Sequence, residues 1–198
     1  IVFGDWSSDV CSSDLAQESG AFAGEIAPVS VASRKGEVRI DADEQPATAR
    51  PEKIPTLKPA FRRDGTVTAA NSSSISDGAA AVTMMRRSEA EKRGLTPIAT
   101  IIGHSTHAST PGLFPSAPVG AINRLLERVN WNAKDVDLWE VNEAFAVVAM
   151  IAMRDIGIAH DKINVHGGAC ALGHPIGASG ARIVVTLISA LRKYGMKK

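Results

Sequence analysis

Apolar positions at helical spacing follow a glycine-rich segment near the end of the sequence. The small residues at 178–181 come first, and an apolar stripe with the period of one helix face follows. The stripe consists of Ile183, Val184, Leu187, Ile188 and Leu191. It predicts a helix over 178–193, and the short apolar run Ile163–Val165 predicts a strand before the glycine-rich segment. The region is therefore expected to run strand, loop, helix.

The same patterning continues through the second half of the chain, where apolar runs suited to strands alternate with amphipathic stretches. Strands are expected near 79–85, 98–103, 136–141 and 163–165. Helices are expected near 88–93, 119–129, 143–156 and 178–193. Shorter β-like pieces lie within Phe22–Ala32 and Glu37–Ile40. This alternation predicts an α/β fold.

The candidate chemistry lies in Asn164–Arg182, which reads NVHGGACALGHPIGASGAR. His174 stands between Gly173 and Pro175, and the proline disfavours a helical backbone at the histidine. A helix that begins just beyond it directs free N–H groups and the positive end of its dipole toward the loop. A histidine in this setting can stabilise an oxyanion or activate a nucleophile. The alternative is a buried histidine bonded to a carbonyl within a structural turn, but the density of glycine favours a site.

Composition excludes several other classes. The formal net charge of the 198 residues is +1 and no basic face is evident, so nucleic acid is not an expected partner. No apolar run is long enough for a transmembrane helix or a signal peptide. Cys11 and Cys170 are far apart, which gives neither a metal-binding spacing nor a disulfide framework. His104 and His107 are interpreted as surface histidines, so no metal site is expected. The glycine spacing G-x-x-x-G-x-x-G also differs from the dinucleotide-binding pattern.

Three motifs carry a resemblance to a known family. GGACALGHPIGASGAR resembles the active-site histidine motif of the thiolases, the acyl-CoA C-acyltransferases. VNEAFA (Val141–Ala146) and GTVTAANSSSISDGAAA (Gly65–Ala81) resemble two further motifs of that family, in its order and at its usual separations. The resemblance covers nearly everything from Ala16 to Lys198. It implies a thiolase-like layered α/β fold that is incomplete here, with most of the C-terminal half and part of the loop domain.

The resemblance also implies a domain organisation. Residues 16–75 correspond to the remainder of a loop domain that covers coenzyme A, 76–97 to the end of the first thiolase-fold half, and 98–198 to a truncated C-terminal half. Residues 1–15 do not fit this organisation, and Asp5–Leu15 resembles the translation of a sequencing adapter. The hypothesis for 1–15 is a non-native leader, and the alternative is a genuine disordered one.

Site residues are carried over from the family by motif. His174 would activate a nucleophilic cysteine and, together with a water held by Asn142, polarise the thioester carbonyl. The alternative for Asn142 is the N-cap of the helix expected over 143–156. The residues matched to the pantetheine tunnel and acyl pocket are Ser73, Phe61, Ala69, Phe114 and Phe145. Cys170 is interpreted as a packing residue.

The resemblance places the two reactive cysteines of the family outside this chain, one upstream of Ala16 and one in a C-x-G-G-G segment shortly after Lys198. The chain is therefore expected to be an incomplete C-terminal portion that is inactive alone, with coenzyme A as a substrate and no cofactor. The expected setting is cytoplasmic, as a homodimer or homotetramer at full length. The alternatives are an inactive CoA-binding fragment, or another thiolase-like condensing enzyme or lipid-carrier relative. The G-H-P and N-E-A-F motifs together favour a true thiolase.

Overall fold

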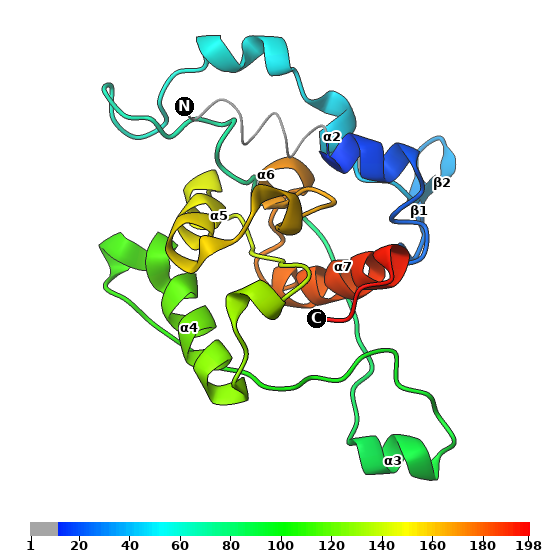
Figure 1. Ribbon diagram of the computed structural model, residues 1–198. Coiled ribbons are helices and arrows are strands. Elements are labelled where there is room, and N and C mark those ends of the chain that lie inside the picture. The colour runs from blue at the N-terminus through cyan, green and yellow to red at the C-terminus, as the bar shows by residue number, and fades with distance from the viewer. Residues whose placement is uncertain (1–11) are drawn as a thin grey trace.

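The structure is a computed structural model that describes residues 12–198, and the elements lie around a central group of helices (Figure 1). Residues 12–18 are helical. The strands are β1 (Val29–Ser33) and β2 (Gly36–Ile40). The α-helices are α2 (Glu44–Thr48), α3 (Arg87–Lys92), α4 (Ala117–Val129), α5 (Ala146–Ala152), α6 (Ala169–Leu172) and α7 (Ser179–Tyr194). Short 3-10 or π segments are Pro51–Thr56, Pro111–Ser116, Ala133–Asp135, Met153–Gly157 and His160–Lys162. Most of the leader predicted for 1–15 lies outside the described residues.

The main core forms where α5 packs against the segments that precede and follow it. Its buried side chains are Val141, Val148, Ala149, Ala152, Ile158 and Ile163, and Trp139 and Phe145 pack against them. A smaller cluster of Ala16, Ala21 and Phe22 packs against Leu172 of α6. The first cluster buries α5, and the second packs against the end of α6.

Helices α4 and α7 confirm the predictions made from helical spacing. Each ends at a residue in the left-handed region, Asn130 (φ 53°) after α4 and Gly195 (φ 67°) after α7. These residue types adopt that conformation at low cost and allow the cap to bond back into the last turn. The α3 helix also lies where the sequence predicts it, but it stands away from the body on two extended segments (Figure 1).

The prediction of a helix over 143–156 is wrong at its N-terminal end. Phe145 has extended dihedrals (φ −141°, ψ 150°) and forms an antiparallel bridge with Ser72, so α5 begins only at Ala146. The backbone N–H of Ala146 donates to Asn71 O at 3.0 Å. Asn142 is therefore not the N-cap of this helix. At its other end α5 passes into the π-helical turn Met153–Gly157.

The strands predicted over 136–141 and 163–165 shrink to a single parallel bridge between Trp139 and Ile163. The reason is Asn164, whose left-handed backbone (φ 47°) turns the chain out of the ladder. Its side-chain amide then takes over the pairing: Oδ1 accepts from Val141 N and Nδ2 donates to Val141 O, each at 2.9 Å. One side chain thus satisfies the backbone groups that a longer strand would have paired.

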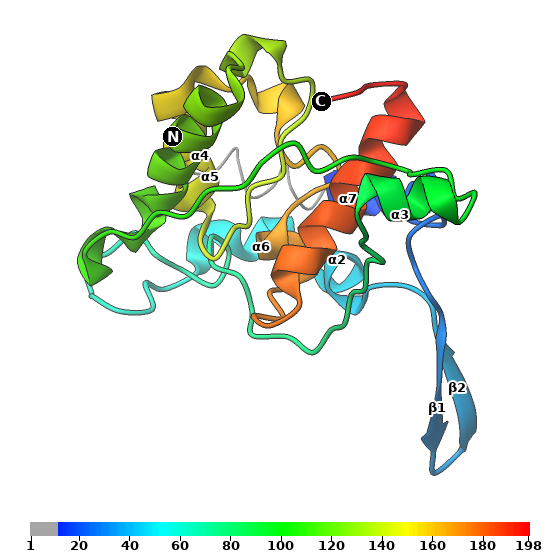
Figure 2. The ribbon, with the colours of Figure 1, turned by 90° about the horizontal axis from the view of Figure 1, so that it is seen from below.

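The strands predicted over 79–85 and 98–103 are also wrong, because both segments run extended without a ladder among the described residues. Their apolar side chains stay in solvent, with Met84, Ile98 and Ile101 each 69 % exposed. Strands form only where a partner offers backbone groups, and residues 12–198 offer none beside these segments. The β-like pieces within 22–40 do pair, as the antiparallel hairpin β1–β2 that projects from the body (Figure 2).

Across residues 12–198, every helix is too short or too polar to cross a lipid bilayer.

Candidate active site

The structure brings His174 and Asn142 together although 32 residues separate them in the sequence. His174 Nε2 lies 3.3 Å from Asn142 Nδ2, and both side chains are partly buried. Asn142 Oδ1 is buried and has no hydrogen-bond partner. The pair therefore presents one amide oxygen that is available for a further hydrogen bond.

The backbone of His174 is fixed from one side by the serine-rich segment. His174 N donates to Ser74 O at 3.0 Å, in an isolated parallel bridge with Ile75. Gly173 next to it has φ +93°, and a Cβ there would collide with the Ser76 hydroxyl. Both the backbone angle and the close approach of Ser76 require glycine at this position.

The ring of His174 is held from its other nitrogen by the first residue of α7. His174 Nδ1 lies 2.6 Å from Ser179 Oγ, and Ser179 is 3 % exposed. Ser179 Oγ also lies 3.1 Å from the carbonyl oxygen of Pro175, which accepts the backbone N–H of Ser179 as well. Because α7 is the long helix of this region, its first turn gives the ring a rigid support.

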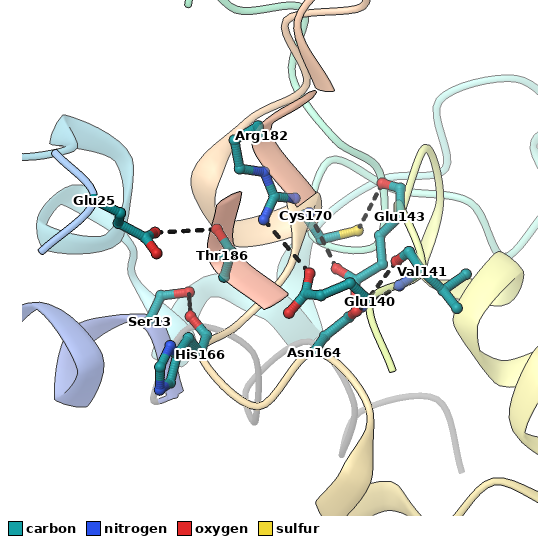
Figure 3. Close-up of polar contacts among 10 residues, drawn as sticks. All are labelled: Ser13, Glu25, Glu140, Val141, Glu143, Asn164, His166, Cys170, Arg182 and Thr186. Atoms are coloured by element: carbon teal, nitrogen blue, oxygen red, sulfur yellow. Dashed lines mark hydrogen bonds and ion pairs between the residues drawn. The ribbon is translucent and has the colours of Figure 1, made fainter. Parts of the chain in front are cut away.

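In the sequence Asn142 stands between Glu140 and Glu143, two carboxylates with buried side chains that interact with other elements (Figure 3). On one side, the Glu143 carboxylate accepts from Asn164 Nδ2 and, at 3.3 Å, from Cys170 N in α6. A Cβ on Gly168 would overlap that carboxylate, so glycine is needed there too. The segment that carries Asn142 is thus bonded tightly to the loop that leads to His174.

On the other side of Asn142, the Glu140 carboxylate faces Arg182 of α7, with Oε2 3.6 Å from Nη1 (Figure 3). Burial raises the pKa of Glu140 to about 8, although the arginine lowers it and the nearby Glu143 and Glu25 raise it. Burial likewise raises the pKa of Glu25, whose carboxylate accepts from Thr186 Oγ1 at 3.0 Å, and the pKa of Asp43. Three acidic groups therefore share one guanidinium beneath the site.

The remaining predicted site residues lie around this centre to different extents. Ser73 donates to the carbonyl of Ala144 at 2.9 Å through its hydroxyl, next to the N-E-A-F segment. Phe114 and Phe145 contact each other, with ring centroids 6.0 Å apart. Phe61 is 76 % exposed and Ala69 is exposed, and a role in substrate binding stays a prediction for all five of these residues.

Cys170 is buried in α6, and its thiol donates to the carbonyl of Glu143 at 3.7 Å. Burial and this bond agree with a packing role. His166 is also buried: its Nε2 lies 3.2 Å from the Tyr194 hydroxyl, its ring meets Phe22 edge-on, and burial lowers its pKa. In the described part of the chain, no three His, Cys, Asp or Glu side chains gather as a metal site would require.

Sequence reasoning missed Ser179, Asn164 and Glu143. The serine lies five residues after His174, and this spacing within a loop-to-helix transition is the one signal that could have identified it. The other two act across 21 residues of sequence, where spacing carries no information. A pocket of about 350 Å³ opens behind Glu143 and Asn164, lined also by Met153, His160 and Tyr194, and His174 does not line it.

Family models match both parts of the chain. The model described as "Thiolase, C-terminal domain" matches residues 95–198, and "Thiolase, N-terminal domain" matches residues 11–88. The chain belongs to the thiolase family. The two matches place the three motifs, the serine-rich segment, N-E-A-F and G-H-P, within a single thiolase chain, and the partial fold described above is a thiolase-like α/β fold.

Relatives of this thiolase agree in name. It is 46 % identical over 186 residues to the acetyl-CoA acetyltransferase of Paracoccus denitrificans, covering 93 % of this chain and 48 % of the relative. It is 45 % identical to the cytosolic acetyl-CoA acetyltransferase of Mus musculus, covering 91 % of this chain and 46 % of that one. The crystal structure of the Bacillus anthracis acetyl-CoA acetyltransferase superposes with a TM-score of 0.94 at 39 % identity, covering 98 % of this chain and 50 % of that one. The chain spans about half the length of the curated relatives it matches.

Proposed function

We propose that this chain carries the histidine and the asparagine of the active site of an acyl-CoA C-acyltransferase. Such an enzyme transfers an acyl group between an enzyme cysteine and coenzyme A. The reactions would be thiolysis of 3-ketoacyl-CoA and the reverse Claisen condensation. The observation that carries the proposal is the 3.3 Å approach of Asn142 Nδ2 to His174 Nε2. Two motifs that resemble those of the thiolases are far apart in sequence and converge at this contact.

Acyl transfer to a thiol needs a base for the thiol proton and hydrogen-bond donors for the oxygen that gains charge. His174 Nε2 would take the thiol proton, and the protonated ring would then donate to the thioester oxygen. Asn142 Oδ1, buried and without a partner, would accept one proton of a water molecule whose other proton points at the same oxygen. The two side chains would thereby form one oxyanion hole.

The attacking thiol would come from outside the described residues, because the Cys170 thiol is buried and directed at a backbone carbonyl. Acyl-CoA would lie along Ser73, Phe61, Ala69, Phe114 and Phe145. We further propose that the complete protein is cytoplasmic and acts as a homodimer or homotetramer without a cofactor. The names of the relatives, one of which is called cytosolic, support the compartment and the substrate class.

A chimera tests this function. Residues 16–198 would replace the corresponding part of the Paracoccus denitrificans acetyl-CoA acetyltransferase, which supplies the rest of its own length. The chimera is expected to cleave acetoacetyl-CoA in the presence of coenzyme A. In the same background, His174→Ala and Asn142→Ala are expected to lower kcat by about 10²-fold or more, because each removes a group that acts in the transition state.

The control is His104→Ala, which removes an exposed histidine that is distant in sequence from His174. A chimera that folds and binds coenzyme A but does not cleave the substrate would contradict the proposal. The same holds if His174→Ala leaves kcat unchanged. In that case the chain would be a binding module only.

A further inference from the structure

The contact between His174 and Ser179 determines more than the ring position. Ser179 Oγ is within hydrogen-bond distance of two groups, His174 Nδ1 at 2.6 Å and Pro175 O at 3.1 Å. A carbonyl oxygen only accepts, and a serine hydroxyl has one proton to donate. If that proton goes to Pro175 O, the hydroxyl oxygen can meet Nδ1 only as an acceptor, which requires a proton on Nδ1.

The opposite side of the ring agrees with this assignment. When a neutral imidazole carries its proton on Nδ1, Nε2 is a bare acceptor. The group that faces Nε2 is Asn142 Nδ2, a donor, at 3.3 Å. The chain of bonds then runs in one direction, from Asn142 Nδ2 through the ring to Ser179 Oγ and on to Pro175 O, with each hydrogen used once.

The reverse tautomer fits less well. With the proton on Nε2, the ring N–H would point at the Asn142 amide N–H, unless the amide turned over. Ser179 would also have to release Pro175 O in order to donate to Nδ1. The second change would act against a side chain that is 3 % exposed and fixed at the first turn of α7. The Pro175 carbonyl also accepts the backbone N–H groups of Ala178 and Ser179, each at 2.8 Å, which fixes the position of that oxygen at the start of α7.

We propose that Ser179 is a positioning residue that keeps neutral His174 in the Nδ1–H tautomer, so that Nε2 faces the site as a base. The catalytic use of this tautomer rests on the proposed acyl-transfer function. The tautomer itself follows from the contacts of His174 within this chain. Ser179 does not touch the reacting atoms. It acts through the ring, as the buried carboxylate does for the histidine of a serine-protease triad, where the wrong tautomer lowers kcat by about 10⁴.

Nitrogen NMR on the 198-residue chain tests the proposal directly. The two ring nitrogens of a histidine have widely separated ¹⁵N shifts when one is protonated and the other is bare, so the spectrum shows the tautomer. Histidine would be ¹⁵N-labelled, spectra recorded at a pH where the ring is neutral, and the His174 signals assigned by their loss in His174→Gln. The wild-type chain is expected to show a protonated Nδ1 and a bare Nε2.

Ser179→Ala removes the acceptor and is expected to shift the tautomer ratio toward Nε2–H by about fivefold or more, the effect of one ordinary hydrogen bond. Ser179→Thr keeps a hydroxyl and is expected to retain the wild-type tautomer. Ser189→Ala is the matched control, because it removes a hydroxyl from the same helix ten residues further along and should leave the His174 signals unchanged.

Two results would overturn the proposal: an Nε2–H tautomer in the wild-type chain, or an unchanged ratio in a folded Ser179→Ala variant. If Ser179→Ala does not fold, the wild-type and threonine spectra still decide. In the chimera, Ser179→Ala is expected to lower kcat by about 10-fold or more and to leave KM unchanged. A chimera without activity would refute the proposed function and leave the tautomer result standing, so the two failures are distinguishable.

Discussion

The buried carboxyl of Glu140 makes the stability of this chain depend on pH in an unusual direction. Burial raises its pKa to about 8 from the ordinary 4.5, against the opposing charge of Arg182. Between those two values the native chain holds a proton that the unfolded chain has released. The free energy of unfolding therefore falls as the pH rises through this window, by at most about 1.4 kcal/mol per pH unit. Burial raises the pKa of Glu25 and Asp43 too, which adds to the same trend.

Glu140→Gln isolates this contribution. Glutamine has nearly the shape of the protonated carboxyl and does not titrate, so the variant is expected to match the wild type within about 1 kcal/mol near pH 5. Its stability should then fall less steeply than that of the wild type, by about 1 kcal/mol per pH unit, up to pH 8. The difference between the unfolding free energies of the two chains removes the contribution of other titrating groups. One such group is His166, because burial lowers its pKa.

The assay is urea unfolding followed by circular dichroism at pH 5, 6, 7 and 8. Glu37→Gln on the exposed strand β2 is the matched control, and its stability should follow the wild-type pH dependence. If the free energy of unfolding changes with pH by the same amount in Glu140→Gln and the wild type, the reasoning is refuted. Such a result would mean that Arg182, at 3.6 Å, compensates the burial of Glu140 completely.

Two further substitutions test how the loops are held. Asn164→Ala leaves the N–H and C=O of Val141 without their partner and removes one donor to the Glu143 carboxylate, so urea unfolding should show a loss of about 3 kcal/mol or more. Asn130 has the same left-handed backbone but an exposed side chain, so Asn130→Ala should lose only about 1 kcal/mol. Equal losses for the two variants would show that the side-chain bonds of Asn164 contribute nothing to stability. Gly173→Ala should cost about 3 kcal/mol, because φ is +93° and the new methyl group would collide with Ser76, whereas Gly177→Ala enters open space and should be nearly neutral in thermal denaturation. A fully tolerated Gly173→Ala would contradict the geometry of the loop.

The elements predicted correctly are those whose stability is local. The apolar stripe of α7 and the one that ends at Val129 in α4 repeat at the helical period, and their ends coincide with Gly195 and Asn130. The start of α5 was not predictable in this way. It depends on the bridge between Phe145 and Ser72, a contact across more than seventy residues that leaves no trace in the spacing.

The wrong strands have the same cause. An apolar run such as 98–103 shows that a segment suits a strand, but a ladder also needs a partner, and the described residues supply none there. At 136–141 the partner is mostly one side chain, that of Asn164, because its left-handed backbone ends the ladder after Ile163. Neither the missing partner nor the turn at Asn164 can be predicted from the pattern of apolar and polar residues.

The candidate site divides along the same line. The setting of His174 between Gly173 and Pro175 indicated chemistry from the residues themselves, whereas the pairing with Asn142 came from the family resemblance, and the structure brings the two side chains to 3.3 Å. The residues that support this pair could not be predicted from the sequence, because they form polar bonds between segments that are far apart in it. A buried serine, asparagine or glutamate has no periodic pattern that distinguishes it from a surface one.

These supports share a geometric logic. The neighbours of Asn142 at 140, 141 and 143 are each held by another element: Glu140 by Arg182 of α7, Val141 by Asn164, and Glu143 by Asn164 and Cys170. His174 is held by the serine-rich segment through its backbone and by α7 through Ser179. Helix α7 therefore contacts His174 directly and the segment of Asn142 through Glu140, and the loop 163–170 contacts that segment through Asn164 and Cys170. Because both halves rest on the same helix, a change in the position of α7 would move Asn142 and His174 together, and their separation would be preserved. A substitution alters that separation only when it breaks the support of one partner alone, which is why Ser179 and Asn164 are the sensitive positions.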